Sequence, residues 1–375
     1  MHFRALDGLR GVAVLAVFLC HYADSPAVGS WHHTPFWFGW MGVDLFFVLS
    51  GFLITGILFD SLESSRYFRN FYIRRTLRIF PLFYAVWAVC LLLTPFVHVA
   101  WNRYVVAQMF YVGNWTMLGA IRGKHPDPGI LMIGRYPIIF GHFWTLCIEE
   151  QFYLLWPVVV YLVRRRETLL RLALWGAVLV LVLRCALVIM FFRTAITALL
   201  FNASFSRFDS LFIGSALALW LRGRSSELRC PPVLYTSLFY IPAIVLTLLL
   251  VTVGRIQQPL ETSNFVFATV GFTLLALSSV GAILAALDET TRVHRWLQHP
   301  WLVSLGTVSY GFYVLHALPL RILYEANLLG SGVSTVARWT VPVVAFVFFY
   351  TLSRLVYQFY ESRFLRLKDK LAPSR

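Results

Sequence analysis

The first apolar stretch of the chain carries Arg10 and His21, which are eleven residues apart. At about 100° per residue this spacing completes about three helical turns, so both side chains would lie on one helix face, with His21 roughly 16 Å farther along. Histidine titrates near neutrality and can act as a general base or a nucleophile. The pair therefore suits chemistry on an anionic substrate that enters beside Arg10 and must reach His21. In the alternative interpretation, Arg10 anchors the helix and His21 caps its outer end.

Other ionisable residues also interrupt apolar segments, where each would cost about 2.5–3.5 kcal/mol at membrane depth. If these segments cross a membrane in alternating directions, five of them bring polar groups to the outer half that holds His21. We take as candidate catalytic residues His21, Asp44, Glu149 and Glu150, and as candidate substrate-binding residues Trp144, Asp209 and His316. The alternative is a set of structural ion pairs, such as Arg207 with Asp209 or with Glu149.

A cluster of arginines lies before and within the first turn of the third apolar segment. Arg75 and Arg78 are three residues apart and would share a helix face. Guanidinium groups bind phosphate oxygens through forked hydrogen bonds. The candidates for binding an anionic cofactor are therefore Arg10, Arg74, Arg75 and Arg78. On its own, the cluster is also explained as a signal that sets membrane orientation.

The composition indicates which elements must position these residues. Of the 375 residues, 59% are hydrophobic and 13% are charged, against about 25% charged residues in soluble domains. Apolar runs long enough to cross about 30 Å of hydrocarbon recur along the chain. The sequence therefore predicts an all-α, polytopic integral membrane bundle with a single domain over residues 1–375. The ten predicted helices cover 9–24, 38–59, 75–97, 143–163, 170–192, 206–222, 233–253, 264–287, 301–320 and 337–360.

The segment 102–119 is less apolar and is predicted to lie in the membrane interface or to re-enter the membrane. With an even number of helices and a cytoplasmic N-terminus, most of the 32 lysines and arginines fall on the cytoplasmic side. Both termini are therefore predicted to be cytoplasmic. The net charge of +15 follows from this topology and from attraction to anionic lipids, so nucleic-acid binding is not expected. The five cysteines have neither a disulfide nor a zinc spacing, and no metal is predicted.

Motifs spread over nearly the whole chain together resemble the membrane-bound acyltransferase-3 family. They are Leu6-Asp-Gly-Leu-Arg-Gly, Gly42-Val-Asp-Leu-Phe-Phe-Val-Leu-Ser-Gly-Phe-Leu, Arg74-Arg-Thr-Leu-Arg-Ile-Phe-Pro, Trp144-Thr-Leu-Cys-Ile-Glu-Glu-Gln-Phe-Tyr-Leu-Leu-Trp-Pro and Ser309-Tyr-Gly-Phe-Tyr-Val-Leu-His. The resemblance implies a ten-helix domain that uses a cytoplasmic acyl-CoA, usually acetyl-CoA. The acyl group would pass to a hydroxyl of a carbohydrate or of another envelope or small-molecule acceptor.

The same resemblance implies roles for individual residues. His21 would be the essential histidine, Arg10 its motif partner, and Arg75 with Arg78 the second basic motif. We expect these arginines to hold the CoA phosphates, while His21 acts as a base or as a transient acyl carrier. We expect Glu149 or Glu150 to fix its tautomer or to raise its basicity.

The resemblance also carries expectations for the protein's surroundings. The expected location is a bacterial cytoplasmic membrane. Some family members carry an extracytoplasmic hydrolase-like domain that passes the acyl group onward. This chain stops at Arg375, shortly after its last predicted helix. We therefore expect the membrane domain itself, or a separate partner, to deliver the acyl group to the acceptor.

Two other classes of function fit some of the same residues. Intramembrane His, Asp, Glu and Arg also build the proton and substrate pathways of transporters. Against that alternative, no Gly- or Pro-broken helices occur at matching positions in two halves of the chain. A noncatalytic scaffold for envelope glycan machinery is a third possibility. The sequence leaves open the acceptor, the acyl chain length and the oligomeric state.

Overall fold

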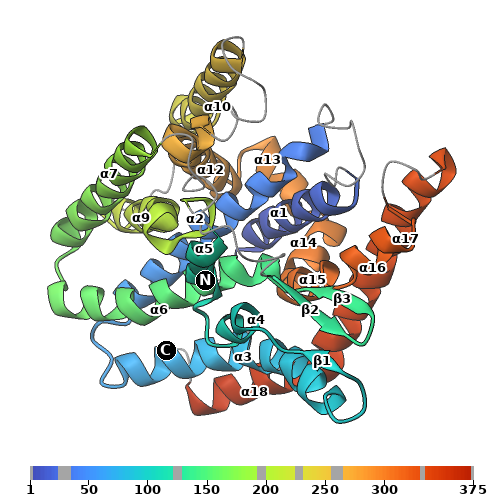
Figure 1. Cartoon of the computed structure of the whole chain (residues 1–375). Helices are drawn as coiled ribbons and strands as arrows, with labels where there is room; N and C mark the ends of the chain where they lie inside the picture. Colours follow the sequence, from blue (N-terminus) through green and yellow to red (C-terminus); the bar gives the residue numbers. More distant parts are fainter. Residues whose placement is uncertain are drawn as a thin grey trace.

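Long apolar runs form the long helices of the protein, as seen in a computed structural model (Figure 1). The structure describes residues 3–23, 35–120, 129–191, 200–223, 231–254, 265–329 and 334–372. The elements up to residue 163 are α1 (Arg4–Ala23), η2 (Pro35–Met41), α2 (Gly42–Asp60), α3 (Tyr67–Leu93), β1 (Val99–Ala100), α4 (Arg103–Met109), α5 (Gly113–Ala120), β2 (Ile130–Ile133), β3 (Tyr136–Ile139), η3 (Gly141–Phe143) and α6 (Trp144–Val163). The later elements are α7 (Arg166–Met190), α9 (Ser204–Leu221), α10 (Pro232–Gly254), η4 (Phe267–Gly271), α12 (Phe272–Leu287), α13 (Arg292–Leu297), α14 (Pro300–Thr307), α15 (Ser309–His316), α16 (Leu320–Glu325), α17 (Thr335–Val356), η5 (Tyr357–Glu361) and α18 (Ser362–Leu371).

The polytopic helical bundle predicted from the sequence is confirmed. In the described ranges, eight helices are long and apolar enough to cross a membrane. Two of the ten predicted spans are not among them. One is α9, which is mostly buried among other helices and whose hydropathy is lowered by Arg207, Asp209 and several serines. The other, 301–320, is divided into α14, α15 and the start of α16. The predicted end residues 24, 192 and 264 lie outside the described ranges.

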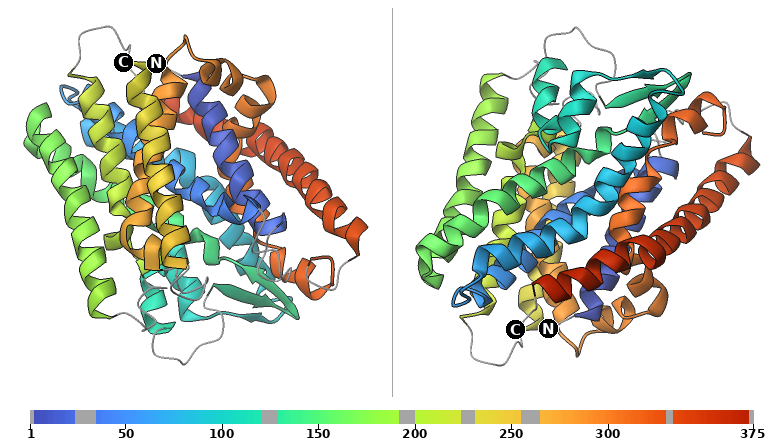
Figure 2. Two further views of the ribbon diagram at one scale, coloured as in Figure 1. Left: turned by 90° about the horizontal axis from the view of Figure 1, so that it is seen from above. Right: turned by 90° about the horizontal axis from the view of Figure 1, so that it is seen from below.

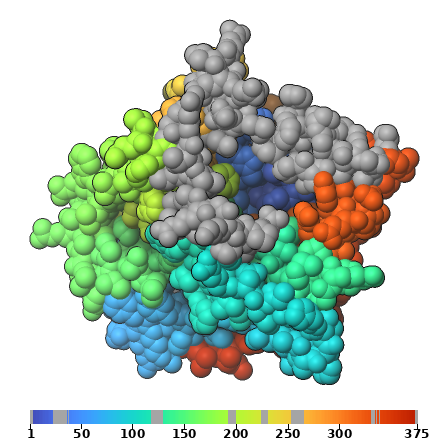
Figure 3. Space-filling view, viewed as in Figure 1, coloured from blue at the N-terminus to red at the C-terminus, as the bar shows by residue number. Residues whose placement is uncertain are grey.

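The two chain ends lie at the same end of the bundle (Figure 2). This arrangement agrees with the even number of predicted spans. The segment 102–119 forms the short helices α4 and α5, of 7 and 8 residues, which are too short to cross a membrane. They lie at the opposite end of the bundle, beside a small antiparallel sheet with the order β1-β2-β3. In the space-filling view the sheet meets the segment that holds α16 (Figure 3). Just before α16, the Leu318 carbonyl accepts a hydrogen bond from the Ile139 amide over 3.1 Å.

Helices α2 and α9 cross at glycines. A Cβ atom at Gly214 would overlap the Val48 carbonyl oxygen, and a Cβ at Gly51 would overlap that of Leu211. Small residues at a crossing let helix backbones approach closely, which matters in a bilayer because lipid removes the hydrophobic driving force between helices. The absence of side chains at these two positions therefore sets the distance between α2 and α9.

Two buried ion pairs connect helices around α9. Arg207 Nη2 donates to Asp44 Oδ1 on α2 over 2.9 Å, and Arg184 Nη1 on α7 donates to Asp209 Oδ2 over 3.0 Å. All four side chains have an exposed fraction of 0%. Thr273 on α12 accepts from Arg184 over 2.6 Å and donates to Asp209 over 2.6 Å. The two ion pairs, with Thr273, thus connect α2, α7, α9 and α12.

We expect Gly214→Ala to lower the stability of the protein, because the new methyl group would push α9 away from α2. Overpacking of this kind typically costs about 1–3 kcal/mol. Thermal unfolding of the detergent-solubilised protein measures the effect. Gly141→Ala is the matched control, since a Cβ there would lie 3.7 Å from Gly129 Cα, an ordinary contact. Equal midpoints for the two variants would contradict the proposed close crossing.

We expect Arg207→Met to destabilise the protein by about 3–5 kcal/mol, because it leaves the Asp44 carboxylate buried without its partner. The double variant Arg207→Met/Asp44→Leu should recover most of this loss, since neither charge is then buried. Equilibrium unfolding of the two single variants and the double variant gives the coupling energy. Additive losses would show that the pair does not stabilise the fold as a unit.

Candidate active site

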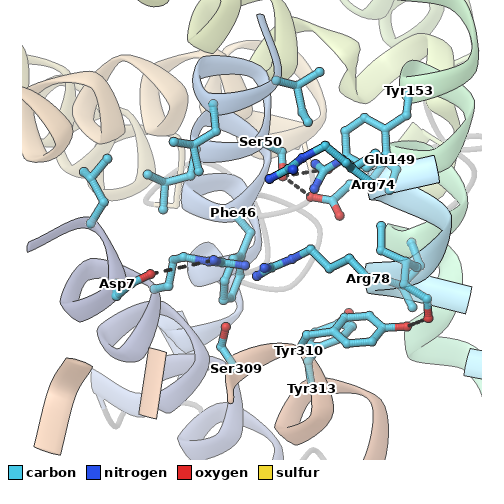
Figure 4. A pocket seen from close by; sticks show the side chains of 18 of the residues that line it. Asp7, Phe46, Ser50, Arg74, Arg78, Glu149, Tyr153, Ser309, Tyr310 and Tyr313 are labelled. Carbon is cyan, nitrogen blue, oxygen red and sulfur yellow. Dashed lines mark hydrogen bonds and ion pairs between the residues drawn. The ribbon is translucent and has the colours of Figure 1, made fainter. Parts of the chain in front are cut away.

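A cavity of about 490 Å³ lies between α1, α2, α3, α6 and α15, and α18 contributes to one side of it (Figure 4). Its apolar wall comes mainly from α2, where Phe46, Leu49 and Leu53 face it. Among the residues that the structure describes, five cationic side chains line the cavity, against two carboxylates, Asp7 and Glu149. The site therefore carries an excess of positive charge.

The five cations come from three helices. They are Arg10 on α1, Arg74, Arg75 and Arg78 on α3, and Lys368 on α18. All four arginines that the sequence assigned to binding an anionic cofactor thus line one cavity. Arg10 Nη1 lies 3.9 Å from Asp7 Oδ1, and Arg78 approaches this pair from the opposite side (Figure 4). Charges from α1 and α3 therefore converge within the cavity.

Two of the α3 arginines have distinct surroundings. Arg74 connects α3 to α18, because its Nη1 donates to the Ala372 carbonyl over 2.8 Å and lies 3.5 Å from Asp369 Oδ1. The guanidinium carbon of Arg75 lies 4.2 Å from the centroid of the Tyr153 ring. Its Nε is buried and has no hydrogen-bond partner in the described part of the chain. Arg75 therefore keeps an unused donor in the cavity wall.

Glu149 and Glu150 face different surroundings, as neighbours on a helix must. Glu149 faces the cavity and accepts a hydrogen bond from Ser50 Oγ over 2.5 Å, and Tyr153 Oη donates to the same Ser50 Oγ over 3.0 Å (Figure 4). Glu150 is not among the lining residues, and its Oε1 is buried without a partner among the described residues. Only Glu149 is thus placed to act on a molecule in the cavity.

His21 is half-buried and contacts a second histidine. Its Nδ1 lies 2.9 Å from His316 Nε2, and the two ring planes are 20° apart, with centroids 5.1 Å apart. The sequence placed Glu149 or Glu150 beside His21, and this expected geometry is wrong, because His316 occupies that place. The partner is 295 positions away in sequence, so local spacing gave no sign of it.

A third histidine extends this pair toward the cavity. His142 is buried, and its ring centroid lies 5.7 Å from that of His316 and 5.5 Å from that of Tyr313. Tyr313 and Thr145 both line the cavity, and their hydroxyl oxygens are 2.7 Å apart. Tyr313 Oη also donates to the His142 carbonyl over 2.8 Å. The hydroxyl pair of Thr145 and Tyr313 thus connects the cationic cavity to the main chain at His142, whose ring lies beside that of His316. In the described ranges, no group of His, Cys, Asp and Glu could hold a metal ion.

Asp44, Asp209 and Trp144 lie outside the lining of the cavity. Asp44 and Asp209 each form a buried ion pair, which is the kind of contact that the alternative interpretation describes. The partners differ from the examples given there, because Arg207 pairs with Asp44 and not with Asp209 or Glu149. The Trp144 ring lies 5.8 Å from the Arg207 guanidinium carbon. The roles expected for Asp44 in catalysis and for Asp209 and Trp144 in substrate binding stay predictions.

Sequence reasoning missed His142, Lys368 and the hydroxyl groups of Ser50 and Tyr313. His142 lies one residue before the predicted helix 143–163, and Lys368 lies beyond the predicted end of the last helix. The alternation of basic and apolar residues in α18 is a signal that could have found Lys368.

Comparison with known proteins identifies relatives along almost the entire chain. The model of a family described as an acyltransferase domain matches residues 3–358. The peptidoglycan O-acetyltransferase OatA of Listeria monocytogenes is 28% identical over 367 residues, which cover 92% of this chain and 55% of OatA. YrhL of Bacillus subtilis, provisionally named a peptidoglycan O-acetyltransferase, is 30% identical over 330 residues, 83% of this chain and 47% of YrhL.

A provisionally named O-acetyltransferase of Staphylococcus aureus (strain COL) is 25% identical over 380 residues, 96% of this chain and 56% of that protein. The chain thus spans about half the length of the curated relatives it matches. No solved structure matches it. Because the family model covers nearly the whole chain, including α1 with His21 and the arginines of α3, the protein belongs to the acyltransferase-3 family.

Proposed function

We propose that the protein is a membrane-embedded O-acyltransferase, which moves an acyl group from acyl-CoA at the cytoplasmic face to a hydroxyl of a carbohydrate acceptor. The observation that carries this proposal is the cavity in which five cations face two carboxylates. An excess of guanidinium groups suits the phosphates of CoA, because each can bind phosphate oxygens through two hydrogen bonds. Acetyl-CoA is the simplest donor.

The cavity also has the size of a small-molecule site. Its volume of about 490 Å³ falls within the roughly 300–1,000 Å³ that small-molecule sites occupy. Arg75 and Arg78 would bind the phosphates near α18, and the apolar wall of α2 would hold the pantetheine arm. The arm would then lead the thioester toward Tyr313 and the histidines.

The reaction that fits this arrangement begins at His21. As a base, His21 takes the proton of the acceptor hydroxyl while the hydroxyl oxygen attacks the thioester carbonyl. The carbon–sulfur bond breaks, and His21 returns the proton to the departing thiolate, which leaves as CoA and restores the base. If His21 instead carries the acyl group, the same bonds break in two steps.

The proposed acceptor is a glycan in the envelope of a bacterium. Two relatives are named for peptidoglycan O-acetylation, which supports an acceptor with sugar hydroxyls. The proposed location is the bacterial cytoplasmic membrane, where cytoplasmic acyl-CoA and an outer glycan would meet. Family membership favours acyl transfer over the transporter alternative. Incubation with radiolabelled acetyl-CoA separates the two, because a transporter would move label without forming a labelled glycan.

Arg75→Met should raise the KM for acetyl-CoA about 10- to 100-fold. Loss of hydrogen bonds to a charged group costs about 1.5–3 kcal/mol, and each 1.4 kcal/mol corresponds to about tenfold in affinity. Steady-state transfer to a soluble glycan acceptor, measured in nanodiscs, gives the value. Arg66→Met is the matched control, because Arg66 is exposed at the start of α3 and does not line the cavity. An equal KM in both variants would contradict a phosphate site at Arg75.

His21→Ala should lower kcat by about 100- to 10,000-fold, the usual contribution of a general base, and leave the binding of acetyl-CoA unchanged. Isothermal titration with acetyl-CoA checks binding, and transfer of labelled acetyl groups checks turnover. Wild-type turnover in this variant would exclude His21 both as base and as acyl carrier.

A further inference from the structure

The imidazole of His316 has a proton position that its surroundings fix. Its Nδ1 lies 3.1 Å from the Phe312 carbonyl oxygen and 2.9 Å from that of Tyr313. Carbonyl oxygens only accept hydrogen bonds, so Nδ1 of His316 must carry the hydrogen. The Tyr22 hydroxyl donates over 2.7 Å to the main-chain carbonyl of His316 and not to its ring. The Phe312 ring stacks on the imidazole. The ring is therefore held in one orientation.

The same surroundings indicate that His316 is neutral. Its exposed fraction is 0%, and its hydrogen-bond partners in the described part of the chain are carbonyl oxygens and His21, with no carboxylate among them. An imidazolium in this position would be a buried charge without a counter-charge, which is costly. A neutral imidazole with its hydrogen on Nδ1 keeps a lone pair on Nε2. Nε2 of His316 is therefore an acceptor.

His21 must then supply the hydrogen in the contact between the two rings. Its Nδ1 lies 2.9 Å from this acceptor, so Nδ1 of His21 is the donor. A neutral His21 in this tautomer has its lone pair on Nε2, which makes no hydrogen bond to any residue that the structure describes. We propose that His316 is a positioning residue that sets the tautomer of His21, and that Nε2 of His21 is the atom that takes the proton or the acyl group. This inference rests on the proposed function.

His316 also fits the later stage of the reaction. When His21 takes up a proton at Nε2, its ring becomes an imidazolium whose Nδ1–H still points at the His316 lone pair. A hydrogen bond from a charged donor is stronger than a neutral one, so the contact strengthens as the charge forms. A carboxylate plays this part beside histidine in many hydrolases. In this protein the neutral imidazole of His316 can accept the hydrogen bond from His21 without adding a negative charge to the buried site.

The first test compares two replacements of His316 in the purified protein. His316→Leu removes the acceptor and should lower kcat about 100-fold or more, while the KM for acetyl-CoA changes less than about twofold. His316→Gln places an amide oxygen near the position of Nε2 and should recover at least tenfold of that loss. Tyr22→Phe is the control for disturbance of the site, since it removes a buried hydrogen bond to His316 but leaves the contact between the rings. It should keep kcat within about threefold.

The second test reads the tautomer itself, without turnover. Nitrogen NMR of the protein with ¹⁵N-labelled histidine, with the signal assigned by its loss in His21→Ala, should show His21 protonated at Nδ1 and unprotonated at Nε2. In His316→Leu the two tautomers should mix.

The outcomes separate this inference from the proposed function. A wild-type protein that transfers no acyl group would overturn the proposed function, and the NMR measurement would still decide the tautomer. An active wild-type protein whose kcat is unchanged in His316→Leu, or a His21 protonated at Nε2, would overturn the role of His316 alone.

Discussion

A charge inside this bundle is costly unless it has a counter-charge or faces a cavity. The pairs Arg207–Asp44 and Arg184–Asp209 meet the first condition, since all four side chains are fully buried and lie 2.9–3.0 Å from their partners. They hold α2, α7, α9 and α12 together. The arginines of α1 and α3 meet the second condition, because they line a cavity in which cations outnumber carboxylates. The cost of isolated charge thus separates residues that stabilise the fold from residues that can bind an anionic ligand.

The sequence predicted the helices accurately where hydropathy is the dominant signal. An apolar run without charged residues placed α10 within one residue of its ends, at 233–253 against Pro232–Gly254, because nothing in it competes with a spanning helix. The prediction of membrane-spanning helices was less accurate where charged or polar residues interrupt the apolar pattern. In α9 the buried ion pairs replace hydrophobicity as the reason for burial, and the 301–320 span is divided at Val308 into short helices. The small sheet and α18 lie outside the apolar runs, so hydropathy could not indicate them.

The sequence named candidates for both parts of the site, but it could predict which of them are neighbours only within one helix. Arg75 and Arg78 could be recognised together because both lie on one helix, and helical spacing places them on one face. The partner of His21 could not be found in this way, because α1 and α15 come together only through tertiary packing. Spacing along one helix carries no information about which residue of another helix faces it. The same limit explains the wrong placement of the glutamates beside His21 and the omission of His142.

The proposed route has a direction, with phosphates at the basic end of the cavity and the acyl group toward Tyr313 and the histidines. A structure of the protein with a thioether analogue of acetyl-CoA, which cannot transfer its acyl group, tests this direction most directly. The route predicts phosphate oxygens within hydrogen-bonding distance of Arg75 and Arg78, and the acyl end beside Tyr313 on the side of His21. Phosphates bound outside the cavity, or an acyl end pointing toward α18, would contradict it.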